Sequence, residues 1–311
     1  IYITAIQTPS LPEIAPLYIT TINLRVVMTQ IIAFAGKKQS GKNTACNFIL
    51  AMKLAELATC KAARLSKSGE IEVSDILGET HPKMEWIPFR DPYIDTEALF
   101  NNELSAFVKM YGLADSLKEM SVSILGLDYQ QVFGTDSDKN SKTKLKWENM
   151  PAVISPSELK KRGVSRKDAE KLGMIVHARG AMTAREVLQY VGTDVFRSMN
   201  SDVWLNSLLN KIESSSPELA LISDVRFENE IEAIQKNKGF VVGLTRDPYE
   251  QTDRHSSESE IEKCLEACDI IVDNSSLTIP EQNEKIYYAL EHLDDVMPRL
   301  AYQEDIITAK E

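Results

Sequence analysis

Ile31-Ile-Ala-Phe-Ala35-Gly36-Lys-Lys-Gln-Ser40-Gly41-Lys42-Asn43-Thr44 is an apolar strand pattern that runs into a glycine-rich loop and then into a helical pattern. Gly36 and Gly41 allow tight backbone turns, so successive N–H groups and the positive end of the helix dipole face one concavity. Lys42 brings a mobile positive charge to the same place. This order predicts a phosphate-binding loop, and a purely structural glycine turn is the alternative.

One position of this loop departs from the general motif. The residue after the lysine is usually the Ser or Thr that binds magnesium, whereas this chain has Asn43, followed by Thr44. The magnesium ligand at this loop is therefore left open between Thr44 and a water molecule.

Further along the chain, short apolar runs alternate with helical patterns. A helix is expected over Thr44–Leu57, and a long amphipathic stretch lies around Leu104–Leu125. Later come strand patterns at Leu219–Ile222, Phe240–Leu244 and Ile270–Val272, with a helical pattern at Glu228–Lys236. Apolar runs separated by helices are typical of a parallel sheet that is buried on both faces. We therefore expect a three-layer α/β fold.

Two segments interrupt this pattern. Residues 1–27 contain just two charges and three prolines, so the folded domain is expected over residues 28–311, with an N-terminal strand or arm as the alternative for 1–27. Residues 128–179 contain the polar run Gly134–Lys144 and a lysine-rich helical patch near Ser157–Lys171. Long irregular segments inside domains are usually functional lids or disordered insertions, so we expect an inserted, mobile subregion here.

Composition limits the classes of partner. The 311 residues are 43% apolar, and 35 Lys and Arg against 46 Asp and Glu give a net charge of -11, which argues against a broad basic surface for nucleic acid. The four cysteines form no CxxC pair, which favours a reducing cytoplasm without zinc. No apolar run approaches the roughly 20 residues of a spanning helix, and no signal peptide is recognisable, so neither membrane nor export is expected.

Polar residues gather where the strand pattern Leu219–Ile222 ends. Asp224 is placed to hold magnesium or its water, and the alternative is a helix cap. Arg226 could hold a phosphate with its planar fork, and the alternative is an ion pair with Glu230. We favour binding of phosphate or of an acceptor.

A second polar group lies upstream. Thr183 is expected to cap a helix that presents Arg185 and Gln189 on one face, and Gly192-Thr193 is expected to break that helix and expose N–H groups. Trp204 is either part of an acceptor site or a core residue. A third group, Asp253–Glu258 with His255, suits a closing loop, and a surface histidine is the alternative.

Together these residues resemble the phage-type deoxynucleoside monophosphate kinases, relatives of the nucleoside monophosphate kinases and the dephospho-coenzyme A kinases. The resemblance extends from Met28 to about Leu277 and rests on Gly36–Thr44, Leu113–Lys118, Arg185–Asp194, Asp224–Glu230 and Asp253–Glu258. In that family an acidic residue or an amide commonly follows the lysine, as Asn43 does here. The resemblance implies a P-loop kinase fold whose inserted lid helps to bind the acceptor.

The resemblance also implies roles for individual residues. ATP would be bound by Gly36, Ser40, Gly41, Lys42, Asn43 and Thr44. The acceptor would be surrounded by Lys38, Arg185, Gly192, Thr193, Trp204, Asp224, Arg226 and Glu230. The catalytic residues would be Lys42, Arg185, Asp224 and Arg226, with Mg²⁺ at Thr44 and Asp224. Leu113–Lys118 would form an acceptor-side helix, and Asp273-Asn274-Ser275 resembles the turn beside the donor adenine.

The expected reaction is in-line transfer of the γ-phosphoryl group of Mg-ATP to the 5′-phosphate of a deoxynucleoside monophosphate (dNMP). Two alternatives stay open: a dephospho-coenzyme A kinase, in which Asp224 would act as a general base, and a P-loop module that binds nucleotide without catalysis. The expected partners are the small molecules ATP and dNMP. The oligomeric state is open, with a homodimer among the options, and the expected location is the cytoplasm, that of a host if the protein is viral.

Overall fold

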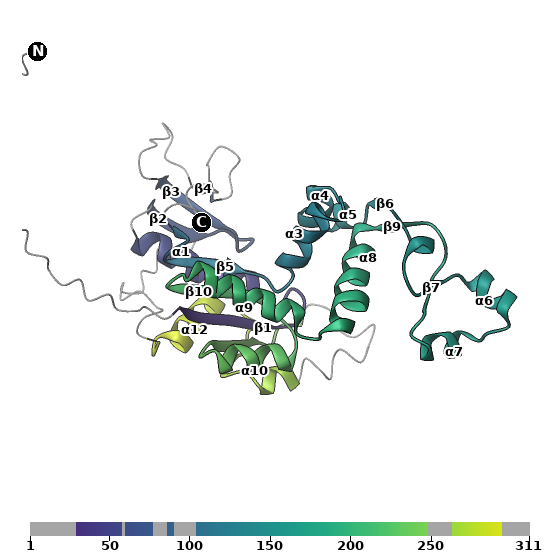
Figure 1. The fold of residues 1–311 in the computed structure, drawn as a ribbon. Helices are drawn as coiled ribbons and strands as arrows, with labels where there is room; N and C mark the ends of the chain where they lie inside the picture. The colour runs from purple at the N-terminus through teal and green to yellow at the C-terminus, as the bar shows by residue number, and fades with distance from the viewer. Residues whose placement is uncertain (1–28, 58–59, 77–85, 90–103, 248–262, 294–311) are drawn as a thin grey trace, which may run out of the picture.

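A parallel sheet forms the centre of the molecule (Figure 1). The computed structural model describes residues 29–57, 60–76, 86–89, 104–247 and 263–293. Within them the sheet has five strands in the order β12-β11-β1-β10-β5, and every neighbouring pair is parallel. The strands are β1 (Gln30–Gly36), β5 (Val108–Tyr111), β10 (Leu219–Val225), β11 (Phe240–Leu244) and β12 (Ile270–Val272). This confirms the expected fold class.

Helices cover both faces of the sheet, as the continuous apolar strands require. Along β1, Ile32 and Phe34 point to the face covered by α1 (Lys42–Glu56) and α12 (Ile279–Leu290). Ile31, Ala33 and Ala35 point to the opposite face, which is covered by α9 (Val203–Ser215) and α10 (Glu228–Lys236). Both faces are therefore dry, and the three layers hold the carboxyl ends of the strands in fixed positions.

Helix α1 is covered on its outer side as well. A small antiparallel sheet, formed by β2 (Cys60–Leu65), β3 (Ile71–Ile76) and β4 (Ile87–Pro88), packs Ala63, Leu65 and Val73 into the same core as α1. A helix enclosed in this way can be apolar around its whole circumference, as Ala45–Met52 largely is. The phosphate loop therefore leads into a helix that is held from two sides.

The stretch Leu104–Leu125, which appeared as one long amphipathic pattern, is divided into a strand and a helix. Val108–Tyr111 pairs with β10 as the edge strand β5, and α3 (Asp115–Ser123) follows. At the break the Asp115 carboxylate accepts a hydrogen bond from the Gly112 N–H at 2.6 Å. The expectation of a continuous pattern was wrong because pairing with β10 overrides local periodicity.

Beyond α3 the chain forms a projection to one side of the sheet (Figure 1). Its elements are α4 (Tyr129–Phe133), α5 (Asp136–Lys139), β6 (Lys142–Lys146), η2 (Trp147–Asn149), β7 (Val153–Ile154), α6 (Pro156–Arg162), α7 (Arg166–Lys171), β8 (Ile175–Val176), β9 (Ala181–Thr183), α8 (Ala184–Gln189) and the π-helix η3 (Tyr190–Arg197). Residues 128–179 thus form short helices and strands. Val132 and Trp147 pack with Met182, Val187 and Tyr190 in one small apolar cluster, and Ile154, Leu159 and Ala169 form another. Movement of this subregion as a lid stays a prediction.

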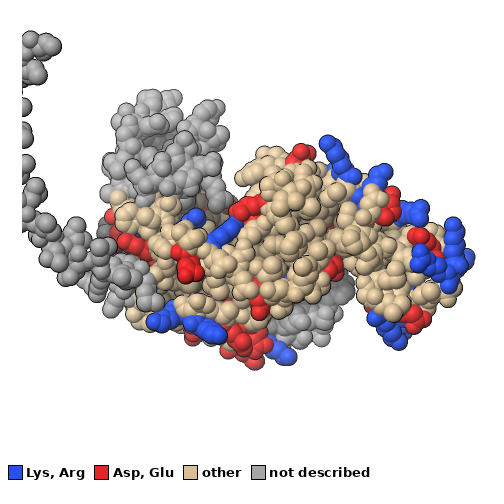
Figure 2. All heavy atoms as spheres, in the orientation of Figure 1, with Lys and Arg blue, Asp and Glu red and all other residues tan. Residues whose placement is uncertain are grey.

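Basic side chains gather at the outer end of the projection, over α6 and α7 (Figure 2). In the part of the chain that the structure describes, no helix combines the length and the apolarity needed to cross a membrane. The N-terminal residues 1–27 and the expected closing loop Asp253–Glu258, with His255, lie outside the described residues.

Candidate active site

The phosphate loop joins β1 to α1 at the carboxyl edge of the sheet. Gly36 and Gly41 have φ values of +147° and +99°, a region that favours glycine. A Cβ on Gly36 would lie 2.6 Å from the Leu244 carbonyl oxygen, and one on Gly41 would lie 2.5 Å from Oε1 of Gln282. Both glycines are therefore required by backbone conformation and by close approach, as a phosphate cradle demands.

Lys42 begins α1 and is buried beneath this loop, with 6% of the residue exposed. Its ammonium group donates hydrogen bonds to the carbonyl of Gly36 at 2.9 Å and to that of Lys37. Burial and then the nearby charge of Arg226 lower the pKa of Lys42 to about 8, against the opposing effect of the Asp224 carboxylate. A lysine in this position can move its charge onto a bound phosphate at little desolvation cost, because it is already desolvated.

This pKa predicts a pH dependence of nucleotide binding. If the charged form of Lys42 binds ATP, affinity falls as Lys42 loses its proton, because its pKa in the free protein is about 8. The dissociation constant for ATP is expected to rise about tenfold for each pH unit above this pKa and to stay flat below it. Calorimetric titration across this range checks the prediction. The Lys42→Met variant, which has no such proton to lose, should show no rise.

A large cleft opens beside the loop, with a volume of about 860 Å³. Among its described lining residues are six cations (Lys38, Lys42, Lys118, Lys139, Arg185 and Arg226) and four carboxylates (Glu70, Asp115, Asp136 and Asp224). Positive charge thus predominates here although the whole chain carries a net charge of -11. Such a local excess attracts polyanionic ligands.

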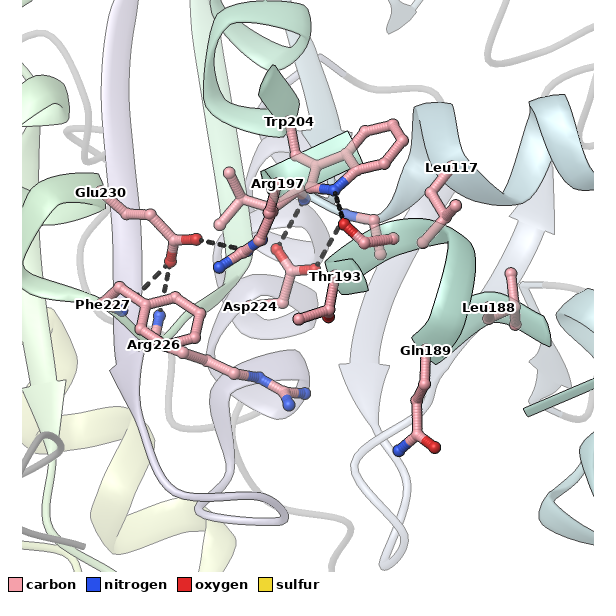
Figure 3. A pocket seen from close by; sticks show the side chains of 13 residues that line it. Leu117, Leu188, Gln189, Thr193, Arg197, Trp204, Asp224, Arg226, Phe227 and Glu230 are labelled. Atoms are coloured by element: carbon pink, nitrogen blue, oxygen red, sulfur yellow. Dashed lines mark hydrogen bonds and ion pairs between the residues drawn. The ribbon is translucent and has the colours of Figure 1, made fainter. Parts of the chain in front are cut away.

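A second, smaller cavity of about 360 Å³ lies next to the cleft (Figure 3). It is lined by Leu113, Ala114, Leu117, Leu188, Gln189, Gly192, Thr193, Arg197, Trp204, Asp224, Arg226, Phe227 and Glu230. Ala114, Asp224 and Arg226 line both cavities. A charged space and a largely apolar, aromatic space therefore share one boundary.

Asp224 occupies this boundary at the end of β10. Its carboxylate accepts hydrogen bonds from the backbone N–H of Leu113 at 2.8 Å and of Ala114 at 3.5 Å. Burial raises the pKa of Asp224, and these two N–H groups oppose the rise. The carboxylate thus receives N–H groups just before α3 rather than capping α10, the helix that follows it, and it still lines both cavities.

Glu230 has the capping role at α10. It is 3% exposed, and its carboxylate accepts from the backbone N–H of Arg226 at 2.9 Å and of Phe227 at 3.2 Å. Burial raises its pKa. The same carboxylate pairs with the Arg197 guanidinium at 3.1 Å, which lies over the Phe227 ring. Glu230 therefore holds the wall of the smaller cavity in place.

Because Glu230 pairs with Arg197, the Arg226 side chain is left available to bind a ligand. Figure 3 shows its guanidinium extending away from the Glu230 carboxylate. Within the described residues it makes no hydrogen bond or ion pair with Glu230, the pairing that the sequence left as an alternative. Arg197 forms the ion pair with Glu230 instead. The four-residue spacing from Arg226 to Glu230 did not predict this pairing. Arg226 is thus positioned to meet an anion from the cleft side.

Helix α8 begins as expected and ends differently. Thr183 caps it by accepting from the Glu186 N–H at 3.1 Å. Gly192-Thr193 does not break the helix, which continues as the π-helix η3 because the backbone widens there instead of stopping. The predicted break was therefore wrong. The Gly192 carbonyl accepts a hydrogen bond from Nε1 of Trp204 at 3.0 Å.

Gly192 and Trp204 also set the shape of the smaller cavity. A Cβ on Gly192 would lie 2.7 Å from Cδ2 of Leu117, so glycine allows α3 to approach the π-helix closely. Trp204 is 8% exposed and packs against Phe196 with ring centroids 5.3 Å apart. It is thus a buried residue that also lines the cavity with one part of its indole.

Arg185, at the start of α8, is joined to α5 and, through Asp136, to the phosphate loop. One of its Nη atoms donates to the Asp136 carboxylate at 2.7 Å, and its Nε donates to Oδ1 of Asn140 at 3.0 Å. Asp136 also lies 3.8 Å from the Lys38 ammonium group. The hydrogen bond from Arg185, followed by the charge of Lys38, lowers the pKa of Asp136. The sequence predicted no role for Asp136 or Asn140, because the polarity of the run Gly134–Lys144 does not show which residues it contacts.

Residues that could hold magnesium also line the cleft. Thr44 and Asp224 both line it and offer hard oxygen donors. Within the described ranges no group of three or more His, Cys, Asp or Glu is arranged to hold a metal ion. Mg²⁺ commonly takes one or two protein oxygens and keeps several waters, so the donors at this cleft suit it.

The turn Asp273-Asn274-Ser275 has a structural role that the resemblance did not imply. The Asp273 carboxylate accepts from the Thr245 hydroxyl at 2.6 Å. Asn274 is fully buried and donates to the Ser40 carbonyl at 2.7 Å. This turn therefore contacts the phosphate loop directly.

Two comparisons with known proteins find a family and a relative that this chain resembles. The family model described as "Deoxynucleotide monophosphate kinase" matches residues 95–286, which is more than half of the chain. A protein of Acanthamoeba polyphaga mimivirus, named "Putative deoxynucleotide monophosphate kinase", is 31% identical over 114 residues, or 32% of this chain and 56% of the relative. The alignment thus spans little more than half of that relative's length.

Proposed function

Because this chain belongs to the deoxynucleotide monophosphate kinase family, we propose that it transfers the γ-phosphoryl group of Mg-ATP to the 5′-phosphate of a deoxynucleoside monophosphate. The observation that carries the proposal is the shared boundary of the two cavities, at Asp224 and Arg226. A phosphoryl transfer between two nucleotides needs two adjacent sites, with cations where the phosphates meet. The charged cleft beside the phosphate loop and the aromatic cavity next to it meet that need.

The cleft is the donor site in this proposal. The backbone N–H groups of Gly36–Thr44 surround the β- and γ-phosphates, and Lys42 moves its ammonium group from the loop carbonyls to the phosphate oxygens. Thr44 and Asp224 would hold Mg²⁺ directly or through water. When bound, the ion neutralises charge on the phosphates and orients them for in-line attack.

The smaller cavity is the nucleoside side of the acceptor site. Trp204 and Phe227 offer aromatic surface and Leu117 offers apolar surface, while Gln189 and Thr193 offer polar groups for the edge of a base or for the sugar. The acceptor phosphate would then lie at the boundary, within reach of Arg226 and of the cleft residues Arg185 and Lys38. Gly192 and Glu230 contribute to this site through its shape.

Phosphoryl transfer requires little covalent chemistry from the protein. The transition state spreads negative charge over the transferred group, so cations in fixed positions supply most of the rate enhancement. Lys42, Arg185 and Arg226 would converge on that group from the loop, from α8 and from the end of β10. Asp224 would order magnesium or the acceptor rather than remove a proton, because a phosphate monoester is already ionised at neutral pH.

The proposal is tested by coupled ADP release with Mg-ATP and a panel of acceptors. The panel contains dAMP, dCMP, dGMP, dTMP, the corresponding ribonucleotides and dephospho-coenzyme A. Turnover with one or more dNMPs is the expected result. Turnover with dephospho-coenzyme A alone would replace the proposal with the other kinase class, and ATP binding without turnover on any acceptor would favour a non-catalytic module.

A further inference from the structure

Two fully buried amide side chains lie against the phosphate loop from behind. Asn274 follows β12, and Gln282 lies in the first turns of α12; both have 0% exposure. They are 234 and 241 positions away from the loop residues that they contact. The mechanism proposed above assigns neither of them a role.

The contacts form one connected network. Nδ2 of Asn274 donates to the Ser40 carbonyl at 2.7 Å and to Oε1 of Gln282 at 2.6 Å. Nε2 of Gln282 donates to the Gly41 carbonyl at 3.4 Å. On the other side, Oδ1 of Asn274 accepts from the backbone N–H of Arg246 at 2.8 Å, and the Arg246 guanidinium donates to the Asn274 and Leu277 carbonyls. The turn after β12 is thus anchored before it reaches the loop.

The direction of these bonds has a consequence for the loop. A peptide unit is planar and trans, so its C=O and its N–H point in opposite directions. Holding the Ser40 carbonyl toward Asn274 turns the N–H of Gly41 the other way. The Gly41 carbonyl accepts the first helical hydrogen bond of α1, from the Ala45 N–H at 2.9 Å, and Gln282 adds a second bond that keeps the N–H of Lys42 pointing away from it. These are the N–H groups at the start of α1, where a phosphate would be bound.

We propose that Asn274 and Gln282 are positioning residues that orient the Gly41 and Lys42 N–H groups toward the triphosphate of ATP. They touch no substrate and act through the two peptide planes. Gly41 is the N-cap of α1 at φ +99°, so the first turn of the helix holds its carbonyl through the Ala45 N–H, and the Asn274 contact holds the carbonyl of Ser40 just before it. The close approach of Gln282 to Gly41, where a Cβ would lie 2.5 Å from Oε1, shows that the network fills the space behind the loop.

α12 provides a matched control for this inference. Asn283, the residue after Gln282, is also an amide with 0% exposure, but neither of its polar side-chain atoms has a hydrogen-bond partner among the described residues. Gln282→Met and Asn283→Leu each replace a buried amide with an apolar group of similar size. One substitution removes the bonds to the network, and the other removes none.

The test measures Mg-ATP affinity by calorimetry, the affinity for dGMP and dTMP, and the melting temperature. The inference rests on the proposed function in one respect, namely that the loop binds the triphosphate. Gln282→Met is expected to weaken ATP binding about tenfold, and Asn274→Ala by at least as much, with less than about a twofold change for the monophosphates. Asn283→Leu is expected to leave all these affinities unchanged.

Two outcomes would overturn the inference. One is wild-type ATP affinity in both Gln282→Met and Asn274→Ala. The other is an equal loss of ATP and monophosphate affinity in Gln282→Met and Asn283→Leu, which would indicate general loosening of α12. A wild-type protein that binds ATP but phosphorylates no acceptor would contradict the proposed function while leaving this test intact.

Discussion

Lys42→Met is expected to lower kcat/KM for ATP by about three powers of ten or more, because in the proposed reaction it removes the charge that meets the transferred phosphoryl group. Methionine keeps most of the volume of the lysine stem, so the packing of α1 is retained. Coupled ADP release, with the acceptor that the panel identifies, measures the effect. Turnover near that of the wild type would show that the loop does not bind the phosphates.

The stability of this variant separates a functional loss from misfolding. At pH 7 Lys42 is charged in the folded and unfolded states, since its pKa is lowered from 10.5 to about 8. Below pH 8 the lowered pKa therefore disfavours the folded state by about 3 kcal/mol, a penalty that fades between about pH 8 and 10.5. Removing the charge relieves this penalty. The loss of the hydrogen bonds to the Gly36 and Lys37 carbonyls costs about 1 kcal/mol each, which offsets part of the gain. The melting temperature should therefore stay the same or rise.

Arg185→Ala is expected to lower kcat by about three powers of ten, with a smaller effect on ATP affinity. The Asn140 and Asp136 contacts engage Nε and one Nη of the guanidinium, which leaves further N–H groups for a phosphate in the cleft. An arginine that bridges donor and acceptor phosphates acts mainly in the transition state, so kcat should fall more than KM rises. Single-turnover kinetics at saturating ATP measures this loss.

Two further variants sharpen this prediction. Arg185→Lys keeps a positive charge but loses the planar fork, so it should recover part of the rate and not all of it. Arg179→Ala removes an exposed arginine whose partner is Glu158 on the projection, and it should leave turnover unchanged. Equal activity of Arg179→Ala and Arg185→Ala would contradict the assignment of Arg185 to the reaction.

The effects expected for the Arg185 substitutions depend on the contact of Asp136, on the projection, with Lys38 of the phosphate loop. Asp136 belongs to the subregion that the sequence predicts to be an insertion, and it pairs with both Arg185 and Lys38. The subregion therefore reaches the cleft beside the phosphate loop with its own side chains. The polarity of the segment predicted an insertion but not its contacts, because a run of Ser, Asp, Lys and Asn is equally typical of a solvated loop.

Local features were predictable because they depend on neighbours in the chain. The strand, glycine loop and helix at Gly36–Thr44 follow from backbone preferences within one short stretch, and the Thr183 cap needs no residue beyond Glu186. The same holds for α10, which spans Glu228–Lys236 as expected. The errors arose where local preference was overridden, at β5 and at the π-helix after Gln189.

The sequence by itself determined the parallel α/β fold, the phosphate loop and the set of polar residues at the strand ends. The tertiary structure alone decided which of these residues meet. Asp224 contacts Leu113 across 111 positions, Arg185 contacts Asp136 across 49, and Asn274 contacts Ser40 across 234. The Asp224 and Asn274 contacts form because the sheet brings distant strand ends to one edge, and the Arg185 contact forms between the helices α8 and α5. No periodicity along the chain records these contacts. The same edge gives Glu230 its partner in Arg197 and leaves Arg226 facing the cleft.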